Sequence, residues 1–497
     1  MASSWNGARV PSGTLPVGVV GSPTLRSLPV GEKIGYALGD TAANLVWRAV
    51  IVFLPFFLTD VAGIGPAAVG VLLLVCRVWD GIADLAMGVA VDRLPTRWGR
   101  FRPWILWSAL PLAVFSVLTF SAPALGSSGR LAYAYLTYAA LVVCYTMNNV
   151  PYNALLGVMS SSPIERSVIA SYRFCFAFLG AALLQGLMMP LLSALSDPRA
   201  AYARAAGQLF HALYRTGREG AFPYTAAMTV FASLALILFV VTFATTRERI
   251  HPPVEQRSSV KQDVSDLVRN RPWLVLFGVG ILCVAFTTLK NGTILYYVTY
   301  YVGNAGLAGP FMIVGLLGAM AGAGATGVLV RLVGKRRLML CSVGLAITSS
   351  VLLYTASPSQ IGLMFTLNAL VDLSTGPIVT LFFAMLADAA DYSEWRTNRR
   401  ATGVFYSAGT VAMKFGSSVG GALTGFLLAA FGYVATSGAP IAHQSAAALH
   451  GIRLLVSVLP AAIALLVLVT FLFYPLDEPR LARIEADLVA RRLGTPS

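Results

Sequence analysis

The sequence is poor in charged residues. Of its 497 residues, 11% are Asp, Glu, Lys or Arg, whereas 57% are hydrophobic, and the mean hydropathy is +0.73. A soluble domain of this size needs about a quarter charged residues to cover its surface. The scarcity of charge therefore excludes a soluble protein and indicates an integral membrane protein.

Cysteine and histidine are also scarce. The five cysteines are Cys76, Cys144, Cys175, Cys283 and Cys341. All of them lie in or next to apolar segments, so we expect small core residues rather than disulfides or metal ligands. The four histidines have no metal-ligand spacing, and the chain has no Walker A loop for ATP. We also find no paired nucleophile and base, so we expect no cofactor and no enzymatic activity.

The charge that is present is mostly positive, and its placement predicts the topology. The net charge is +15, but the basic residues are spread between apolar segments, so we expect no nucleic-acid partner. By the length needed to span a bilayer, the chain has about twelve candidate helices. They are centred near residues 46, 78, 112, 143, 180, 235, 285, 320, 346, 375, 417 and 461. The linkers after the second, fourth, eighth and tenth candidates are basic. We therefore expect an all-α, multi-pass protein of the plasma membrane, the inner membrane of a bacterium, with both termini in the cytoplasm.

The longest polar interruption separates the candidates into two equal groups. We expect a disordered cytoplasmic tail over residues 1–32, bundles of about six helices each over 33–246 and 272–476, a central cytoplasmic loop over 247–271 and a second cytoplasmic tail over 477–497. Gly88–Leu94, followed by Trp98–Arg102, ends the second candidate and is similar to Gly327–Arg337, which ends the eighth. We favour a duplicated unit; the alternative is that glycine followed by basic residues is a generic helix exit. One segment does not fit. Residues 197–221 are rich in arginine although this topology puts them outside, and they are long enough for a short helix.

Two carboxylates and an arginine interrupt the second apolar segment. Asp80 and Asp84 are four residues apart and share a helix face, and Arg77 lies one turn earlier. A charge at the bilayer centre costs roughly 3 kcal/mol, and one arginine leaves the second carboxylate uncompensated. Close carboxylates then need an external cation or a shared proton. We predict a coupling site for sodium or a proton; the alternative is a buried ion pair with Arg77 and no transported ion.

Other intramembrane polar residues indicate a cavity. Lys414 lies deep in a glycine-rich segment of the second half, and the acidic pair is its natural partner. Further polar side chains are Asp40, Asn44 and Arg48 on one face of the first segment, Tyr145, Asn149 and Asn153 in the fourth, and Arg173 early in the fifth. Taken singly, helix–helix hydrogen bonding explains each nearly as well as substrate contact. Their joint presence beside the acidic pair favours a polar cavity. Lys290 and Asn291 either add to this cavity or lie near the membrane interface.

Several separated motifs carry a resemblance to a known family. They are Glu32–Asp40, Thr59–Gly63, Arg77–Asp84, Trp98–Trp104, Leu295–Gly303 and Ala387–Glu394. From Gly31 to about Pro479, the chain resembles the glycoside–pentoside–hexuronide:cation symporter family, the melibiose-permease-like branch of the major facilitator superfamily. The resemblance implies the major facilitator fold, with twelve transmembrane helices in two six-helix halves. It also implies symport of a sugar or glycoside with Na⁺ or H⁺ by alternating access.

The resemblance also implies roles for individual residues. Asp80 and Asp84 would form the cation site with help from Thr146, whose hydroxyl favours sodium, and Lys414 would lie close by. Arg173 matches the family's sugar-binding arginine. The charged stretch thought to help close the inward gate matches Asp388, Asp391, Glu394 and Arg400, and Arg77 is expected to be a structural or gating residue.

Three positions depart from the family pattern. Two sugar-binding aspartates of the melibiose permease fall on Asn44 and Asn149, and a sugar-stacking tryptophan falls on Asn153. Neutral amides bind hydroxyls with a different geometry, so melibiose is not the expected substrate. Arg48 adds a cation to the same face, which suits an acidic sugar such as a hexuronide.

We therefore predict a monomeric, cation-coupled glycoside symporter in the lipid bilayer. One alternative is a carrier of an anionic or lipid-like solute on the same fold. The other is a membrane sugar sensor that has lost coupling. A sensor would be expected to lose the acidic pair and Lys414 and to gain a signalling domain.

Overall fold

The structure, a computed structural model, describes residues 28–93, 98–160, 163–196, 220–249, 265, 267–397, 402–435 and 443–493. Within these ranges every regular element is a helix, as the sequence predicts. The first half contains α1 (Val30–Val52), α2 (Leu54–Phe56), η1 (Phe57–Val61), α3 (Pro66–Arg93), α4 (Arg102–Thr119), α5 (Ser127–Met159), α6 (Pro163–Ser196) and α8 (Ala221–Thr245). The second half contains α10 (Arg271–Tyr296), η2 (Tyr297–Tyr301), η3 (Ala305–Leu307), α11 (Ala308–Val333), α12 (Lys335–Thr355), α13 (Ile361–Thr397), α14 (Thr402–Ala430), α15 (Ala446–Val456) and α16 (Val458–Leu472).

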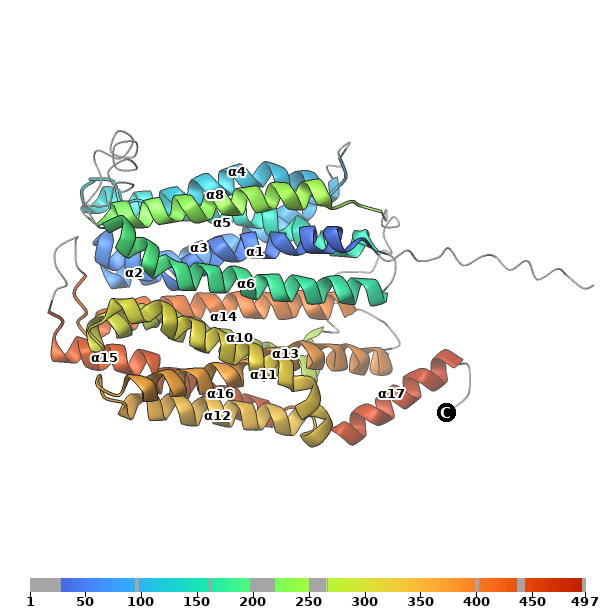
Figure 1. The fold of residues 1–497 in the computed structure, drawn as a ribbon. Coiled ribbons are helices and arrows are strands. Elements are labelled where there is room, and N and C mark those ends of the chain that lie inside the picture. The colour runs from blue at the N-terminus through green and yellow to red at the C-terminus, as the bar shows by residue number, and fades with distance from the viewer. Residues whose placement is uncertain are drawn as a thin grey trace, which may run out of the picture.

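The long helices run side by side in two stacked layers, one for each half (Figure 1). Each predicted centre falls within a helix. Among the described residues, nine helices are long and apolar enough to cross a membrane, and α1 with η1 makes a tenth span bent by 46°. The break between the two parts is at Phe53, two residues before Pro55, which lacks a backbone donor. Helices α3 and α5 fall outside that count, but they are 28 and 33 residues long and lie within the same bundle.

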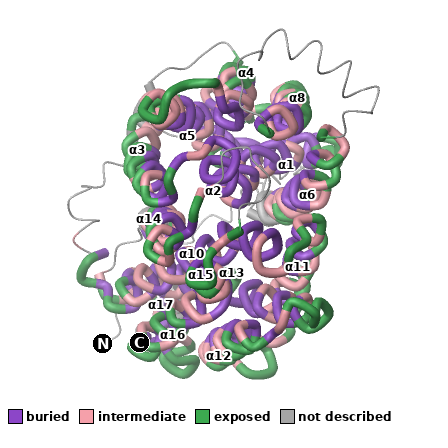
Figure 2. The backbone as a smooth tube through the Cα atoms, turned by 90° about the vertical axis from the view of Figure 1, so that its left-hand side faces the viewer, coloured by how far each residue is buried: buried purple, intermediate pink, exposed green. Residues whose placement is uncertain are grey.

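The same helix pairs pack together in both halves. In the first half, α1 packs on α6 and α8, and α4 packs on α5 and α8. The equivalent contacts in the second half are those of α10 with α14 and α16, and of α12 with α13 and α16. Viewed along the helices, buried residues lie on the faces that point into the bundle and exposed residues lie mainly at its periphery (Figure 2). This equivalence supports the internal duplication predicted from the sequence.

A matching corner in each half supports the duplication further. Gly99 and Gly334 each follow the second long helix of their half and have φ of +114° and +81°, which favours glycine. A Cβ at either position would collide with a glutamate, Glu248 or Glu478, that follows the last helix of the same half. Glu248 accepts hydrogen bonds from the N–H groups of residues 100–102 at 2.8, 2.8 and 2.9 Å. An acidic group is favourable there because it lies at the start of α4.

Some sequence expectations differ from the structure. The C-terminal segment, expected only as a tail, forms helix α17 (Glu478–Leu493), and Trp395 Nε1 donates to Asp487 of this helix at 2.8 Å. All five cysteines are free, but Cys175 and Cys341 are exposed, so the expectation of core positions is wrong for these two. The expected disordered tail to residue 27, most of the central loop, and residues 197–219, where a short helix was expected, lie outside the described residues.

Candidate functional site

The two halves join tightly at the end of the bundle predicted to face the periplasm. Asp60 of η1 is 6% exposed, and its carboxylate accepts hydrogen bonds from the hydroxyls of Tyr300 and Tyr433, the latter at 2.6 Å. Beside it, Thr59 Oγ1 lies 2.9 Å from the hydroxyl of Tyr296. The first half contributes the carboxylate and the threonine, and the second half contributes the three tyrosines. We call these five residues the outer seal. Sequence analysis noted Thr59–Gly63 and Leu295–Gly303 only as motifs and did not foresee their contact.

Glycines let α3 and α14 approach each other next to the outer seal. A Cβ at Gly70 would lie 3.0 Å from the carbonyl oxygen of Ala422, and a Cβ at Gly425 would lie 2.5 Å from that of Pro66. Small residues at such positions allow close backbone packing. At the opposite end, α5 and α13 are not among the closely packed pairs of the described helices. With the predicted orientation, this arrangement corresponds to an inward-facing state.

The predicted cation-site residues come together from three helices. Thr146 Oγ1 on α5 lies 3.0 Å from Asp80 Oδ1 and 3.3 Å from Asp84 Oδ1, both on α3. Lys414 of α14 lies 3.4 Å from Asp80 Oδ2 and contacts Asp84 Oδ2 directly. The predicted pairing of Lys414 with the acidic pair is therefore confirmed. Asp80 is 1% exposed, whereas the side chains of Asp84 and Lys414 are 25% and 36% exposed, so solvent reaches one side of this cluster.

Arg77 completes the charge balance of this cluster. Its Nη1 lies 3.5 Å from Asp80 Oδ2, and its guanidinium lies 4.2 Å from the centre of the Trp47 ring. Trp47 in turn stacks on Tyr145 with ring centres 4.4 Å apart and planes at 20°. Two cations thus face two carboxylates. In this state the acidic pair needs no external ion, because Arg77 and Lys414 already neutralise it.

A second ion pair joins two predicted substrate residues. The guanidinium of Arg173 on α6 binds the carboxylate of Asp40 on α1 through two nitrogens, one directly and one at 3.5 Å. The same guanidinium lies 5.2 Å from the ring centre of Tyr152, which stacks on Tyr36 at 4.7 Å. Asn44 donates to the backbone carbonyl of Asp40 at 2.9 Å. The pair is partly accessible because the Arg173 side chain is only half-buried.

The amides of α5 form a ladder along one face of that helix. Asn153 Nδ2 donates to Asn149 Oδ1 at 2.7 Å, and Asn149 Nδ2 donates to the hydroxyl of Tyr145 at 3.4 Å. Asn153 is exposed and Asn149 is half-buried. The adjacent Asn148 has a different role, since it is buried and donates to Ser108 Oγ at 3.0 Å in a helix–helix contact.

The structure adds one intramembrane carboxylate that sequence analysis missed. Asp372 of α13 binds Lys290 Nζ of α10 at 2.7 Å, and the lysine is 1% exposed. Gly315 of α11 makes this possible, because a Cβ there would collide with the Asp372 carboxylate. The sequence did contain a signal for this pair, because Asp372 is a single acidic residue inside an otherwise apolar segment. Lys290 therefore belongs to the polar interior and not to the membrane interface.

Two ion pairs of the described residues near the predicted cytoplasmic end each lie within one half. Lys335 Nζ binds both oxygens of Asp388 at 2.8 Å, joining α12 to α13 in the second half. Two other predicted gating residues, Asp391 and Glu394, lie further along α13, and Arg400 lies outside the described residues. In the first half, Lys33 Nζ binds Glu165 at 2.7 Å, and this hydrogen bond holds the pKa of the Glu165 carboxyl below its usual range.

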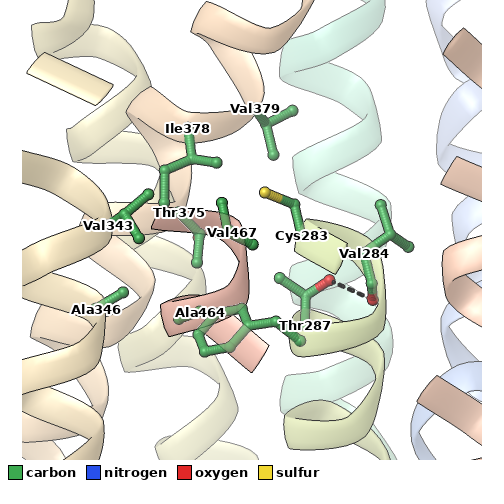
Figure 3. Close-up of a pocket in the computed structure, with 11 residues that line it drawn as sticks. Cys283, Val284, Thr287, Val343, Ala346, Thr375, Ile378, Val379, Ala464 and Val467 are labelled. Atoms are coloured by element: carbon green, nitrogen blue, oxygen red, sulfur yellow. Dashed lines mark hydrogen bonds between the residues drawn. The ribbon is translucent and has the colours of Figure 1, made fainter. Parts of the chain in front are cut away.

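An apolar pocket inside the second half is not part of this site (Figure 3). It lies among α10, α12, α13 and α16 and has a volume of about 40 Å³. Its lining includes no charged residue, and Thr287 donates its hydroxyl hydrogen to the carbonyl of Val284. Ligand pockets usually measure about 300–1,000 Å³. The pocket is therefore too small and too apolar for a sugar.

Comparisons with known proteins find a matching family model and several relatives. A family model described as MFS/sugar transport protein matches residues 35–478. The isoprimeverose transporter of Lactiplantibacillus pentosus is 33% identical over 91% of each chain. Two proteins of Escherichia coli strain K12 are each 32% identical: YagG, provisionally a glycoside/cation symporter, over 94% of this chain and 96% of its own, and a glucuronide carrier protein homologue over 92% and 95%. A solved bacterial homologue of the human lysosomal transporter Spinster has a TM-score of 0.64 at 13% identity over 90% of this chain and 95% of its own, which is a likeness of fold.

Proposed function

Because this chain belongs to the MFS/sugar transport protein family, we propose that it is a symporter that carries a glycoside together with Na⁺ or H⁺ by alternating access. It is a membrane transporter and not an enzyme. Two of the relatives reported above are a glycoside/cation symporter, provisionally assigned, and an isoprimeverose transporter. We also propose that it resides in the bacterial inner membrane with both termini in the cytoplasm and acts as a monomer.

The observation that carries this proposal is the position of Lys414. This lysine of the second half lies between two carboxylates of the first half, within 3.4 Å of Asp80 and in contact with Asp84. An ammonium group and a transported cation would compete for the same oxygens. Binding of Na⁺ or H⁺ to the acidic pair would therefore release Lys414 and loosen one ionic contact between the halves. Coupling follows because a ligand that favours one state of a two-state element shifts the equilibrium toward that state.

A continuous series of contacts supports coupling of this cation site to a sugar site. Asp80 meets Arg77, Arg77 lies on Trp47, Trp47 stacks on Tyr145, and Tyr145 begins the amide ladder of α5. The hydroxyl-binding groups would be Asn149, Asn153 and Asn44 together with the Asp40–Arg173 pair. Amides, carboxylates and guanidinium groups are suited to sugar hydroxyls because together they donate and accept hydrogen bonds.

Two gates would alternate during transport. The outer seal is closed in this structure, so an outward-facing state requires its hydroxyl contacts to break. Closing the opposite end would bring the charged end of α13, which holds Asp388, Asp391 and Glu394, against the first half. Asp388 would then exchange Lys335 for a new partner.

Uptake into energised vesicles tests the proposal. A panel of labelled glycosides would be supplied under a sodium gradient or a pH gradient, imposed separately. We expect gradient-driven accumulation in the wild type and none in Asp80→Asn or Asp84→Asn. Asp477→Asn is the matched control, since it makes the same change at an exposed residue outside the bundle. Accumulation that survives in both acidic-site variants would disprove the assignment of the coupling site.

A further inference from the structure

A small polar pocket lies between the outer seal and the acidic pair. Its polar side chains are Arg77 and Tyr138 from the first half and Thr288, Ser417 and Thr424 from the second half. Arg77 connects the pocket to the acidic pair, because its guanidinium lies 3.5 Å from Asp80. Pro55 also lines the pocket and connects it to the outer seal, because its carbonyl oxygen accepts a hydrogen bond from Thr59 at 3.2 Å. The pocket is therefore part of the contact between the halves.

Helix geometry explains why these side chains meet at one depth. Arg77 lies about one turn from Asp80 along α3, toward the outer seal. Ser417, Gly421 and Thr424 follow each other at intervals of four and three residues, so they share the face of α14 that lines the pocket. Glycine at position 421 leaves space on that face.

Two of the polar groups lack the hydrogen bonds that their burial requires. Tyr138 is 1% exposed, and its hydroxyl has no hydrogen-bond partner in the described ranges of the chain. The Arg77 side chain is 7% exposed, and within the same ranges its one hydrogen-bond acceptor is Asp80, at 3.5 Å. A guanidinium has five N–H donors, and leaving buried donors without an acceptor is costly. The pocket therefore suits a group that accepts from Arg77 and also binds hydroxyls.

The size and the charge of the pocket select its occupant. The centre of a water molecule can occupy about 20 Å³ there. One buried water needs about 10–15 Å³ and two to four polar partners. Arg77 and Lys414 already balance the acidic pair, and Asp60 adds a negative charge in the outer seal, so an anion would be uncompensated. A cation would meet the guanidinium. These charges favour a neutral group that both accepts and donates hydrogen bonds.

We infer that this pocket binds one water molecule, which accepts a hydrogen bond from Arg77 and links it to Tyr138 and to hydroxyls of the second half. Thr424 suits such a bond, because it donates to the carbonyl of Gly420 at 3.0 Å and keeps its lone pairs for another donor. Since the partners come from both halves, this water bridge exists only while the outer end is closed. It is thus a third contact between the halves, beside the outer seal and Lys414.

Two glycines allow the water to be displaced without a clash. A Cβ at Gly421 would lie 3.6 Å from the Leu73 side chain, and a Cβ at Gly292 would lie 3.5 Å from Thr424 Oγ1, both ordinary contacts with the lining. Gly421→Ala and Gly292→Ala therefore fill the pocket. Gly344→Ala is the matched control, because a Cβ there meets nothing within 4 Å.

X-ray footprinting of the purified full-length protein detects the water. Radiolysis converts a bound water into a hydroxyl radical, which oxidises the side chain beside it, whereas a dry buried side chain is spared. We expect oxidation of Tyr138 in the wild type. The rate should fall by at least ~5-fold in both filled variants, where no room for a water remains. It should be unchanged in Gly344→Ala.

Thiol labelling from the outside tests the bridge. The reporter is Leu428→Cys in a chain whose natural cysteines have been replaced. Leu428 is buried, shares its face of α14 with Gly421 and Thr424, and does not line the pocket. Both filled variants leave buried donors of Arg77 unmet only in the closed state, so labelling by an impermeant maleimide should accelerate by about 5- to 150-fold. Tyr138→Phe adds no atom and should accelerate it by about 2- to 10-fold, the range for a neutral hydrogen bond.

Several results would overturn the inference. The water site falls if Tyr138 is not oxidised in the wild type or if its oxidation persists in both filled variants. It also falls if crystals grown with bromide show anomalous scattering in the pocket, which would identify an anion. The bridge falls if Tyr138→Phe is labelled no faster than the parent, because acceleration in the glycine variants alone would be steric. None of these measurements involves transport, so their outcome is independent of the symport assignment.

Discussion

The outer seal makes a quantitative prediction about the balance between inward- and outward-facing states. Tyr433→Phe removes a hydroxyl that donates to the buried carboxylate of Asp60 at 2.6 Å. A hydrogen bond to a charged group contributes about 1.5–3 kcal/mol, and the bond exists only while the seal is closed. Its loss should therefore raise the ratio of outward- to inward-facing molecules by about 10- to 150-fold.

Thiol labelling from the outside measures this ratio. The reporter is Thr424→Cys in a chain whose natural cysteines have been replaced. Thr424 is buried, and it lies about two turns inside the outer end of α14. A membrane-impermeant maleimide should reach this thiol only when the seal is open. The labelling rate in Tyr433→Phe should therefore rise by the same factor as the outward-facing population, as long as that population stays minor.

The structure supplies a control next to the seal. Tyr297 follows Tyr296 in the chain and is buried like Tyr296 and Tyr433, but its hydroxyl makes no hydrogen bond among the described residues. Tyr297→Phe removes the same atom without touching the seal, so its labelling rate should equal that of the parent. If Tyr433→Phe is labelled no faster than Tyr297→Phe, the hydroxyl does not hold the seal and the reasoning is refuted.

Three further predictions follow from contacts described above. Thr146→Ala should abolish sodium-driven uptake but leave proton-driven uptake, because the carboxylates alone can take a proton. Uptake measured under a sodium gradient and under a pH gradient, imposed separately, tests this expectation. Gly425→Ala should prevent the close approach of α3 and α14 and slow transport, whereas Gly344→Ala, where a Cβ meets nothing within 4 Å, should not. The bond from Lys33 lowers the pKa of Glu165 below its usual 4.5, so it stabilises the fold above that pH. This contribution is lost as the pH falls further, and thermal unfolding of Glu165→Gln should lack that acid dependence.

The residues that the sequence predicted well are those whose burial in the membrane has a large free-energy cost. Asp80, Asp84 and Lys414 stand out because each is a charge inside an apolar segment, and a buried charge requires a partner wherever the fold places it. That reasoning predicts a partner without predicting the fold. It succeeded for Lys414 because the second half offered few cations at that depth.

The residues that sequence missed depend on the meeting of distant segments. Asp60 lies next to the end of its helix, where burying a charge costs little desolvation energy. Its tyrosine partners are 240 and 373 positions away in the sequence. No periodicity links such positions. Asp372 was visible as a charge in an apolar segment, but its partner Lys290 was assigned equally to the membrane interface. Helix α17 was missed for another reason, since its spaced apolar residues Leu481, Ile484 and Leu488 form a helical pattern that was set aside as a tail.

The charges of the transported solutes also predict the electrical character of transport. The cluster of Asp80, Asp84, Arg77 and Lys414 has two positive and two negative charges. One coupling cation would make a neutral transported pair with a glycoside that carries one negative charge, such as a glucuronide, and a positively charged pair with a neutral glycoside. Uptake of a glucuronide should then be independent of membrane potential, and uptake of any neutral glycoside with a cation should accelerate when the inside is negative. Potassium diffusion potentials set with valinomycin in proteoliposomes distinguish the two, and glucuronide uptake that rises with an inside-negative potential would mean that more than one cation accompanies each sugar.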